Sequence, residues 1–269
     1  MNSYCYSLES LSEAAGAYES AGAICVKEAF KNEVEELRAG VNRLLQEPGP
    51  FASEHSTSGR FFEDYCNWQR IEQFRSFVLH SKAGELAAAL LRSPVQFFHD
   101  HVIVKSAGMS APTPWHQDMA YFPAEEPQKN VSFWIALDHV EQSVCPQFVE
   151  GSHKANVDFA PRSFDDGKVY TEAKGDRRTG DIEAFVQRGN LLSWALEPGD
   201  FIAFGFKTLH GAPGNMANNL RRAFVMRWME VGSKYRRREG IPPYPWADLG
   251  SGQVFPAEGF PIFPRVHLI

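Results

Sequence analysis

The sequence lacks the features that mark several large classes of protein. Its 269 residues carry a formal net charge of −6, so the basic surface typical of nucleic-acid-binding proteins is not expected. Only four cysteines occur, scattered without a CxxC pair, which favours reduced thiols over a disulfide framework or a zinc ribbon. No apolar stretch has the length of a membrane span, and the N-terminus lacks the basic and apolar regions of a signal peptide. We therefore expect a cytoplasmic globular protein that binds neither nucleic acid nor membranes.

Apolar residues recur at helical spacing in two stretches of the first third, residues 27–46 and 71–91. After residue 94 the pattern changes to short runs of aromatic and β-branched residues bounded by Gly, Pro, Asn or Asp. These predicted strands cover residues 95–105, 131–137, 191–196, 201–206 and 222–230.

This order of elements predicts one domain over residues 1–269, mainly β with flanking helices, of the jelly-roll type. Its N-terminal helical part covers about residues 1–93, its β core about 94–232 and its C-terminal tail 233–269. Two long irregular connections, residues 159–181 and the segment from 232 onward, are of the kind that covers or shapes a site.

A His-x-Asp motif, His116 and Asp118, provides two side chains that can bind a metal. In extended chain residues i and i+2 point to the same face, so this pair can converge while Gln117 turns away. A third ligand must come from a distant strand, and His210, directly after the predicted strand 201–206, is the strongest candidate. Two imidazoles and one carboxylate on one side of a metal form the facial arrangement of non-haem iron oxygenases, which leaves positions open for co-substrate, O₂ and substrate.

The His-x-Asp spacing alone is weak evidence, because a hydrogen-bonded surface turn has the same pattern. The remaining histidines lack a carboxylate at that spacing in a strand-like setting, and we interpret six of them as ordinary core or surface residues: His55, His80, His99, His139, His153 and His267.

Arg221 supplies a second ingredient, eleven residues after His210 on the following strand. A guanidinium is always charged and binds a carboxylate through two parallel hydrogen bonds, as a metal-chelating keto acid requires at its far end. Arg222 points to the opposite face and is expected to form a surface ion pair. A zinc hydrolase with the same three ligands would need no such anchor.

In their order along the chain these motifs resemble the phytanoyl-CoA dioxygenase family of iron(II)- and 2-oxoglutarate-dependent oxygenases, most clearly from about residue 98 to 228. The matching segments are Trp-His-Gln-Asp (115–118), Phe-Trp-Ile-Ala-Leu-Asp (133–138), Gly-Ser-His-Lys (151–154), Glu-Pro-Gly-Asp (197–200), His-Gly (210–211) and Arg-Arg-Ala (221–223).

The resemblance implies a double-stranded β-helix, a cupin-like jelly roll, with iron(II) held by His116, Asp118 and His210. It also implies four contacts to 2-oxoglutarate, through Arg221, Gln117, Trp134 and His101. The implied reaction consumes O₂ and 2-oxoglutarate, hydroxylates a small-molecule substrate, and releases succinate and CO₂. Halogenating relatives replace the metal-binding carboxylate by Ala or Gly, so the intact Asp118 favours hydroxylation.

The sequence departs from the family pattern at two places. Residues 141–148 replace an Asn-Gly-Cys-Leu turn, which is expected to reshape the pocket rather than the iron site, and Ala212 replaces a serine that contacts the co-substrate. Candidate substrate walls are Tyr121, Phe122 and Arg227, although packing or surface pairing explains them equally well.

The substrate itself is not specified by these motifs. The cationic run at residues 234–238 is compatible with an anionic small molecule, and desaturation, ring formation or epimerisation would use the same metal ligands. A zinc hydrolase on the same fold and a catalytically silent binding module remain the alternatives from other classes.

Overall fold

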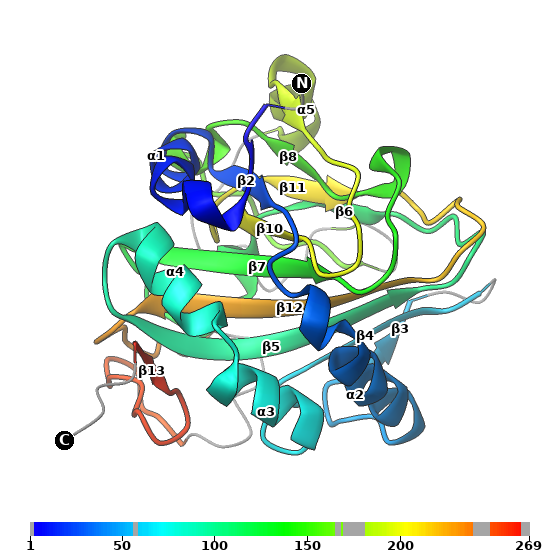
Figure 1. The fold of residues 1–269 in the computed structure, drawn as a ribbon. Helices are drawn as coiled ribbons and strands as arrows, with labels where there is room; N and C mark the ends of the chain where they lie inside the picture. Colours follow the sequence, from blue (N-terminus) through cyan, green and yellow to red (C-terminus); the bar gives the residue numbers. More distant parts are fainter. Residues whose placement is uncertain (1–2, 56–58, 165–167, 169–180, 239–247, 265–269) are drawn as a thin grey trace.

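The computed structural model describes residues 3–55, 59–164, 168, 181–238 and 248–264, which form two β-sheets with helices packed on their outer sides (Figure 1). The large sheet contains, in spatial order, β1 (Cys5–Tyr6), β2 (Ala23–Val26), β10 (Phe201–Phe204), β7 (Asn130–Ala136), β12 (Arg221–Glu230), β5 (Val95–Lys105), β4 (Phe61–Tyr65) and β3 (Ser53–Glu54), and β13 (Ile262–Phe263) pairs with β5. The small sheet contains β6 (Thr113–His116), β11 (His210–Ala212), β8 (Gln147–Val149) and β9 (Leu191–Leu192). The jelly-roll fold expected from the sequence is confirmed.

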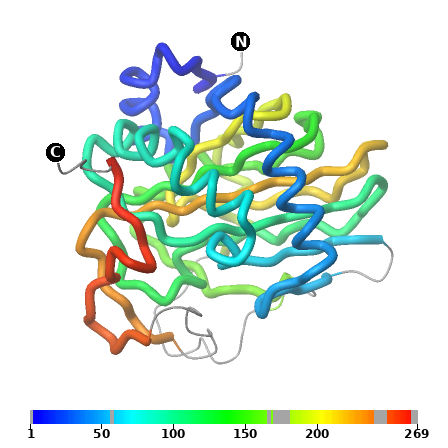
Figure 2. Tube along the Cα trace, turned by 60° about the horizontal axis from the view of Figure 1, so that its bottom comes forward, coloured from blue at the N-terminus to red at the C-terminus, as the bar shows by residue number. Residues whose placement is uncertain are grey.

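The helices of the described residues are α1 (Leu11–Ala21), α2 (Val34–Gln46), α3 (Glu72–His80), α4 (Ala83–Leu91) and α5 (Ile182–Arg188). In both ribbon views α2, α3 and α4 cross the long strands on the same side (Figures 1 and 2). None of the helices in the described part of the chain has the length and apolarity needed to cross a membrane.

The alternation of side chains along β7 and β12 separates two apolar cores. Phe133 on β7 and Phe224 on β12 are buried against the helices, whereas Trp134 and Val225 point into the space between the sheets. Both faces of these strands are therefore covered, which is why their sequences read as continuous apolar runs. On β12 the inward face also carries Arg221, at its first residue.

Four predicted strands, 95–105, 131–137, 201–206 and 222–230, are confirmed to within two residues at each end. The strand predicted at 191–196 is wrong in length, because only Leu191–Leu192 pairs as β9. Its apolar character comes from burial: Trp194 and Leu196 pack into the core between the sheets without continuing the ladder.

Both predicted helices differ from the structure at one point. The stretch 71–91 forms two helices, because Ser81 is extended (ψ 167°) and its hydroxyl accepts a hydrogen bond from the Ala83 amide. In the stretch 27–46 a 3₁₀ helix covers Lys31–Glu33 and the α-helix begins only at Val34, since Lys27 and the Glu28 amide bind the Asp200 carboxylate instead. The N-terminal part also contributes strands to the large sheet, including β2 beside β10 and β4 beside β5.

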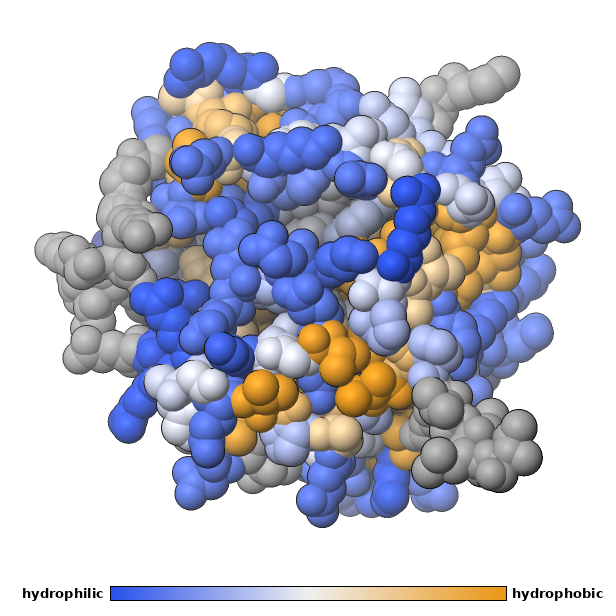
Figure 3. Space-filling view, turned by 90° about the vertical axis from the view of Figure 1, so that its left-hand side faces the viewer, coloured by the Kyte–Doolittle hydropathy of each residue, from blue (hydrophilic) through white to orange (hydrophobic). Residues whose placement is uncertain are grey.

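Hydrophilic side chains dominate the face of the molecule shown in Figure 3, where the apolar residues form small groups among them. Large exposed apolar residues in the described chain are few and separated in sequence: Leu191, Met216, Leu220, Val231 and Val254. Scattered apolar residues of this kind are normal for a protein surface and do not by themselves mark a partner site.

The helix-facing core predicts a large cost for truncating Phe133, which is fully buried with its ring 4.4 Å from that of Phe201. Phe133→Ala should lower the free energy of unfolding by about 3–5 kcal/mol, because the surrounding helices cannot fill the cavity. Urea denaturation would measure it, with Met216→Ala, 66% exposed, as the control expected within about 0.5 kcal/mol of wild type. Equal midpoints for both variants would contradict this placement of the core.

Candidate active site

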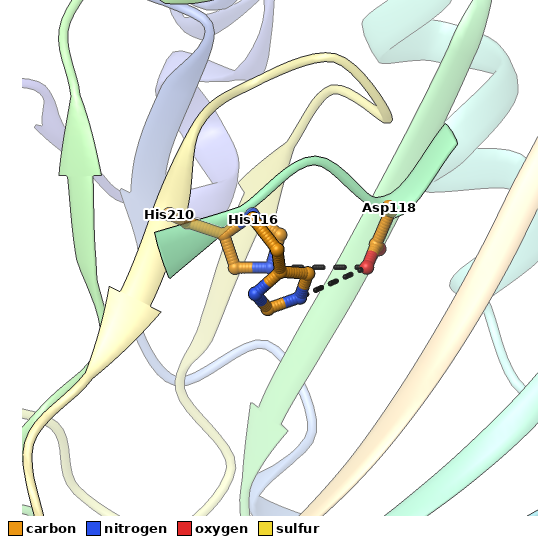
Figure 4. A group of neighbouring side chains, drawn as sticks. All are labelled: His116, Asp118 and His210. Carbon is orange, nitrogen blue, oxygen red and sulfur yellow. Dashed lines mark ion pairs between the residues drawn. The ribbon is translucent and has the colours of Figure 1, made fainter. Parts of the chain in front are cut away.

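Three segments of the chain bring His116, Asp118 and His210 together (Figure 4). His116 ends β6, His210 begins β11, and the antiparallel pairing of these strands sets the two histidines directly opposite each other. Asp118 lies two residues beyond the end of β6, at the start of the 3₁₀ helix Asp118–Tyr121. One ligand atom from each of the three side chains lies within 4.8 Å of the others, a spacing at which all three can bind one ion.

Both imidazoles are held by backbone carbonyl groups. The Nδ1 atom of His116 lies 2.7 Å from the carbonyl oxygen of Pro114, and that of His210 lies 2.9 Å from the oxygen of Thr208. A carbonyl oxygen can only accept, so each Nδ1 carries the proton and donates it. The Nε2 atoms are therefore left with free lone pairs, 3.6 and 3.8 Å from Asp118 Oδ1, as metal ligation requires.

The two oxygens of the Asp118 carboxylate have different partners. Oδ1 faces the imidazoles, whereas Oδ2 accepts hydrogen bonds from Nε of Arg227 (3.2 Å) and from the Ser132 hydroxyl (3.3 Å). This division leaves one oxygen available to a metal and fixes the rotation of the carboxylate with the other.

Burial and charge set the ionisation of the cluster. Burial alone would raise the pKa of Asp118, but the Arg227 guanidinium and the two histidines outweigh it and hold the pKa well below its usual value. Burial and the neighbouring His116 lower the pKa of His210 to about 3. At neutral pH the cluster thus offers an ionised carboxylate and a neutral His210 imidazole, which is the protonation needed to bind a divalent cation.

Arg221 is buried, and the described residues supply no counter-charge to it. Its side chain donates to the carbonyl oxygen of Val144, and among the described residues no carboxylate forms an ion pair with it. Burial lowers the pKa of Arg221 to about 10, so it stays charged at neutral pH. Its neighbour Arg222 behaves as expected and pairs with Asp138 at 2.7 Å, although this pair is only slightly exposed rather than on the open surface.

A single large cavity of about 1200 Å³ connects the metal-ligand cluster to Arg221. Its walls come from the interior faces of β4, β5, β7 and β12 and from the segment that follows Asp118, and are rich in aromatic rings, among them Phe51, Tyr65, Tyr121, Phe122 and Phe164. Both long connections that were expected to cover a site line this cavity, the first through residues 159–161 and 164 and the second through Arg236–Arg238. Residues 165–167, 169–180 and 239–247 of these connections lie outside the described chain. The expected wall residue Arg227 also lines the cavity.

The three other residues expected near the co-substrate all line the cavity, in different settings. Trp134 is both a core aromatic and a cavity wall. The Gln117 amide donates to the Lys207 carbonyl and accepts from the Phe159 amide, so it ties two segments together beside the metal ligands. On β5, His101 lies opposite Val225, and Lys105 lies opposite Arg221. The imidazole of His101 is therefore next to Arg227 and Glu63 rather than next to Arg221.

The departures from the family pattern lie at the cavity. The turn at 141–148 supplies Val144, whose carbonyl binds Arg221, and Pro146 in the wall. Its last residue, Phe148, pairs with His210 across the small sheet and stacks on its ring, with centroids 5.6 Å apart. This segment therefore touches a candidate metal ligand as well as shaping the pocket, which is more than the sequence suggested. Ala212 lines the cavity without a hydroxyl.

Sequence reasoning missed a charged cluster on the cavity wall. Glu63 on β4 lies between two histidines, 2.7 Å from His55 Nε2 and 3.2 Å from His101 Nε2. Burial alone would raise the pKa of Glu63, but the hydrogen bonds and the charges of the two imidazoles together have the larger effect and lower the pKa below its usual value. His55, interpreted above as an ordinary residue, thus lines the cavity. The sequence contains no motif from which its proximity to His101 could be predicted.

The chemistry of the donor set, two imidazole nitrogens and one carboxylate oxygen beside a buried cationic anchor, defines the class of an iron- and 2-oxoglutarate-dependent oxygenase. Comparisons with known proteins agree. The family model for phytanoyl-CoA dioxygenase (PhyH) matches residues 18–223, which is more than half of the chain. This chain belongs to the phytanoyl-CoA dioxygenase family.

Individual relatives are distant. The peroxisomal phytanoyl-CoA dioxygenase of Bos taurus is 22% identical over 242 residues, covering 83% of this chain and 69% of the relative. The epimerase SnoN from nogalamycin biosynthesis superposes with a TM-score of 0.77 at 24% identity, covering 97% of this chain and 98% of SnoN. The carbocyclase SnoK from the same biosynthesis gives 0.76 at 23% identity, covering 93% and 95%. SnoN has also been solved with Fe³⁺, alpha ketoglutarate and nogalamycin RO.

The geometry of the cluster predicts that His210→Ala abolishes binding of a divalent metal at moderate affinity, because two remaining ligands cannot hold the ion. Titration of metal-free protein with iron(II) or cobalt(II) under anaerobic conditions would measure the loss. His139→Ala, which removes a half-exposed histidine paired with Glu197, should bind as wild type. Unchanged affinity in His210→Ala would remove this residue from the ligand set.

Proposed function

We propose that this enzyme hydroxylates a small-molecule substrate, with iron(II) held by His116, Asp118 and His210 and with the far carboxylate of 2-oxoglutarate bound by Arg221. The observation that carries the proposal is the buried Arg221 in the same cavity as the metal ligands, with no carboxylate of the described chain to neutralise it. A buried cation without an anion is costly, and a dicarboxylic keto acid that reaches from the metal to this residue would remove the cost.

When bound, iron(II) and 2-oxoglutarate would supply the oxidising power of the reaction, consuming O₂ and releasing succinate and CO₂. The residues of this chain would orient the groups that bind the metal and the co-substrate. The backbone carbonyls of Pro114 and Thr208 orient the imidazoles, and Arg227 orients the carboxylate of Asp118. The aromatic walls, including Tyr121 and Phe164 beside His116, exclude water from the reacting end of the cavity.

Two observations favour this function over its alternatives. In a halogenating enzyme a halide would take the place of the metal-binding carboxylate. Asp118 occupies that place here, which favours hydroxylation over halogenation. A zinc hydrolase would use the same three ligands but would leave the buried Arg221 without a partner. Relatives that are an epimerase and a carbocyclase show the range of reactions on this scaffold, so product analysis must accompany any activity.

The substrate that we propose is anionic, since Arg236, Arg237 and Arg238 all line the cavity. Contacts of Gln117, Trp134 and His101 to the co-substrate and a cytoplasmic location stay predictions from the sequence.

The first test is addition of iron(II) and 2-oxoglutarate to the metal-free protein under anaerobic conditions, followed by visible absorption. A weak charge-transfer band is expected from the chelate. Absence of the band, together with tight zinc binding and activity without O₂, would support the hydrolase instead.

Arg221→Ala should leave iron binding within about twofold of wild type and weaken 2-oxoglutarate binding about 100-fold. The loss corresponds to about 3 kcal/mol, the upper range for a hydrogen bond to a charged group. The charge-transfer band, titrated with 2-oxoglutarate, measures the midpoint. Arg222→Ala on the opposite face of β12 is the matched control, expected at the wild-type midpoint. A wild-type midpoint in Arg221→Ala would show that the anchor lies elsewhere.

A further inference from the structure

Arg227 is the second arginine on the cavity side of β12, and one of its nitrogens has no partner. The residue is 5% exposed and lines the same cavity as the metal ligands. Its Nη1 atom is buried without a hydrogen-bond partner in the described structure. A buried, charged N–H group without an acceptor is costly, so an unassigned nitrogen of this kind indicates a missing ligand.

The guanidinium is held rigidly by its other contacts. Nε donates to Asp118 Oδ2 at 3.2 Å, and Nη2 lies 3.5 Å from Nδ1 of His101. The ring of Phe122 covers the guanidinium, 5.1 Å from its central carbon. With Nε and Nη2 in these contacts and the Phe122 ring against the central carbon, rotation of the guanidinium would break the contact with Asp118.

The chain of contacts continues behind His101. The Nε2 atom of His101 is 3.2 Å from Glu63, which is also bound by His55 at 2.7 Å. These contacts position the imidazole that faces Arg227, and Glu63 lies against the two histidines rather than against Arg227. The guanidinium is therefore pre-positioned, as a specific binding group must be to recognise a ligand at low entropic cost.

The charge balance at Arg227 favours an anionic ligand. Asp118 is its only carboxylate partner among the described residues, and in the proposed enzyme the same carboxylate also binds iron(II). Two cationic centres then share one carboxylate, which leaves net positive charge beside the metal. The aromatic side chains nearby, including Phe122 and Tyr65, provide no acceptor of matching charge.

We propose that the guanidinium of Arg227, which lines the cavity, binds a carboxylate of the substrate and so places the neighbouring carbon next to the metal. The inferred substrate class is a carboxylic acid with an aromatic or apolar body, which the aromatic walls of the cavity would contact. This inference rests on the proposed oxygenase function. It gives Arg227 a role separate from that of Arg221, which lies six residues earlier on the same strand.

The test compares 3-phenylpropionate with the uncharged 3-phenylpropionamide as probes of the anaerobic complex with iron(II) and 2-oxoglutarate. Each is titrated while the charge-transfer band is monitored. In wild type the acid should perturb the band at a concentration about 10- to 100-fold lower than the amide does, the range for a hydrogen bond to a charged group. Equal midpoints for acid and amide, or no effect of either, would overturn the proposal without any variant.

Arg227→Gln should remove the preference for the acid, measured as the ratio of the acid and amide midpoints at saturating iron(II) and 2-oxoglutarate, because Arg227 also orients the carboxylate of Asp118. Arg222→Gln, on the opposite face of the strand, should retain the preference. An acid preference that persists in Arg227→Gln would overturn the inference. A preference lost in Arg237→Gln but kept in Arg227→Gln would likewise overturn it, by placing the anion at the arginines of residues 236–238.

The two levels of the argument fail in different ways. If wild type forms no charge-transfer band at all, the proposed function is wrong. If the band forms but responds equally to acid and amide, the oxygenase function stands and only the assignment of Arg227 is wrong.

Discussion

The buried carboxylate of Asp118 is the group on which the arrangement of the site depends. A single negative charge in this interior must be matched on every side, and it is: two imidazoles face one oxygen, and Arg227 and Ser132 bind the other. These partners come from β6, β11, β12 and β7, so matching one charge ties both sheets together at this point. The same contacts that keep the carboxylate ionised also leave one of its oxygens and two imidazole nitrogens facing a common point.

Strand β12 connects this local requirement to the rest of the cavity. Its outward residues, such as Phe224 and Met226, pack under the helices and anchor the strand. Its inward residues alternate with them and include both cavity arginines, Arg221 at the start and Arg227 six residues later. Because the register of β12 is fixed by β5 on one side and β7 on the other, a shift by one residue would turn both arginines into the apolar core. Packing on one face thus specifies chemistry on the other.

Much of this could be predicted from the sequence, for identifiable reasons. The long central strands are buried on both faces and therefore carry a clear apolar signal, and Arg221 begins one of them. His116, Asp118 and His210 lie at or next to the ends of short strands of the small sheet, and their order along the chain was recognisable. Glu63 with His55 could not be found in this way, because the contact joins two segments of the N-terminal part whose spacing has no fixed meaning. Helix boundaries failed where tertiary contacts compete with local preference, as where Lys27 and Glu28 bind Asp200 instead of beginning a helix.

The division between core strands and connecting segments also explains how one scaffold accommodates different substrates. The candidate metal ligands and Arg221 belong to paired strands or lie next to them, where a change of position would disturb both sheets. Part of the cavity wall, by contrast, comes from segments with little pairing of their own, including Phe51, the residues after Asp118, residues 159–161 and 164, and Arg236–Arg238. Such segments can change length and side chains at small cost to the sheets. Arg227 instead contacts the cavity from a central strand, and it also binds a candidate metal ligand. A substrate group held there would be positioned by the rigid part of the fold, which is where a reacting carbon must be held most accurately.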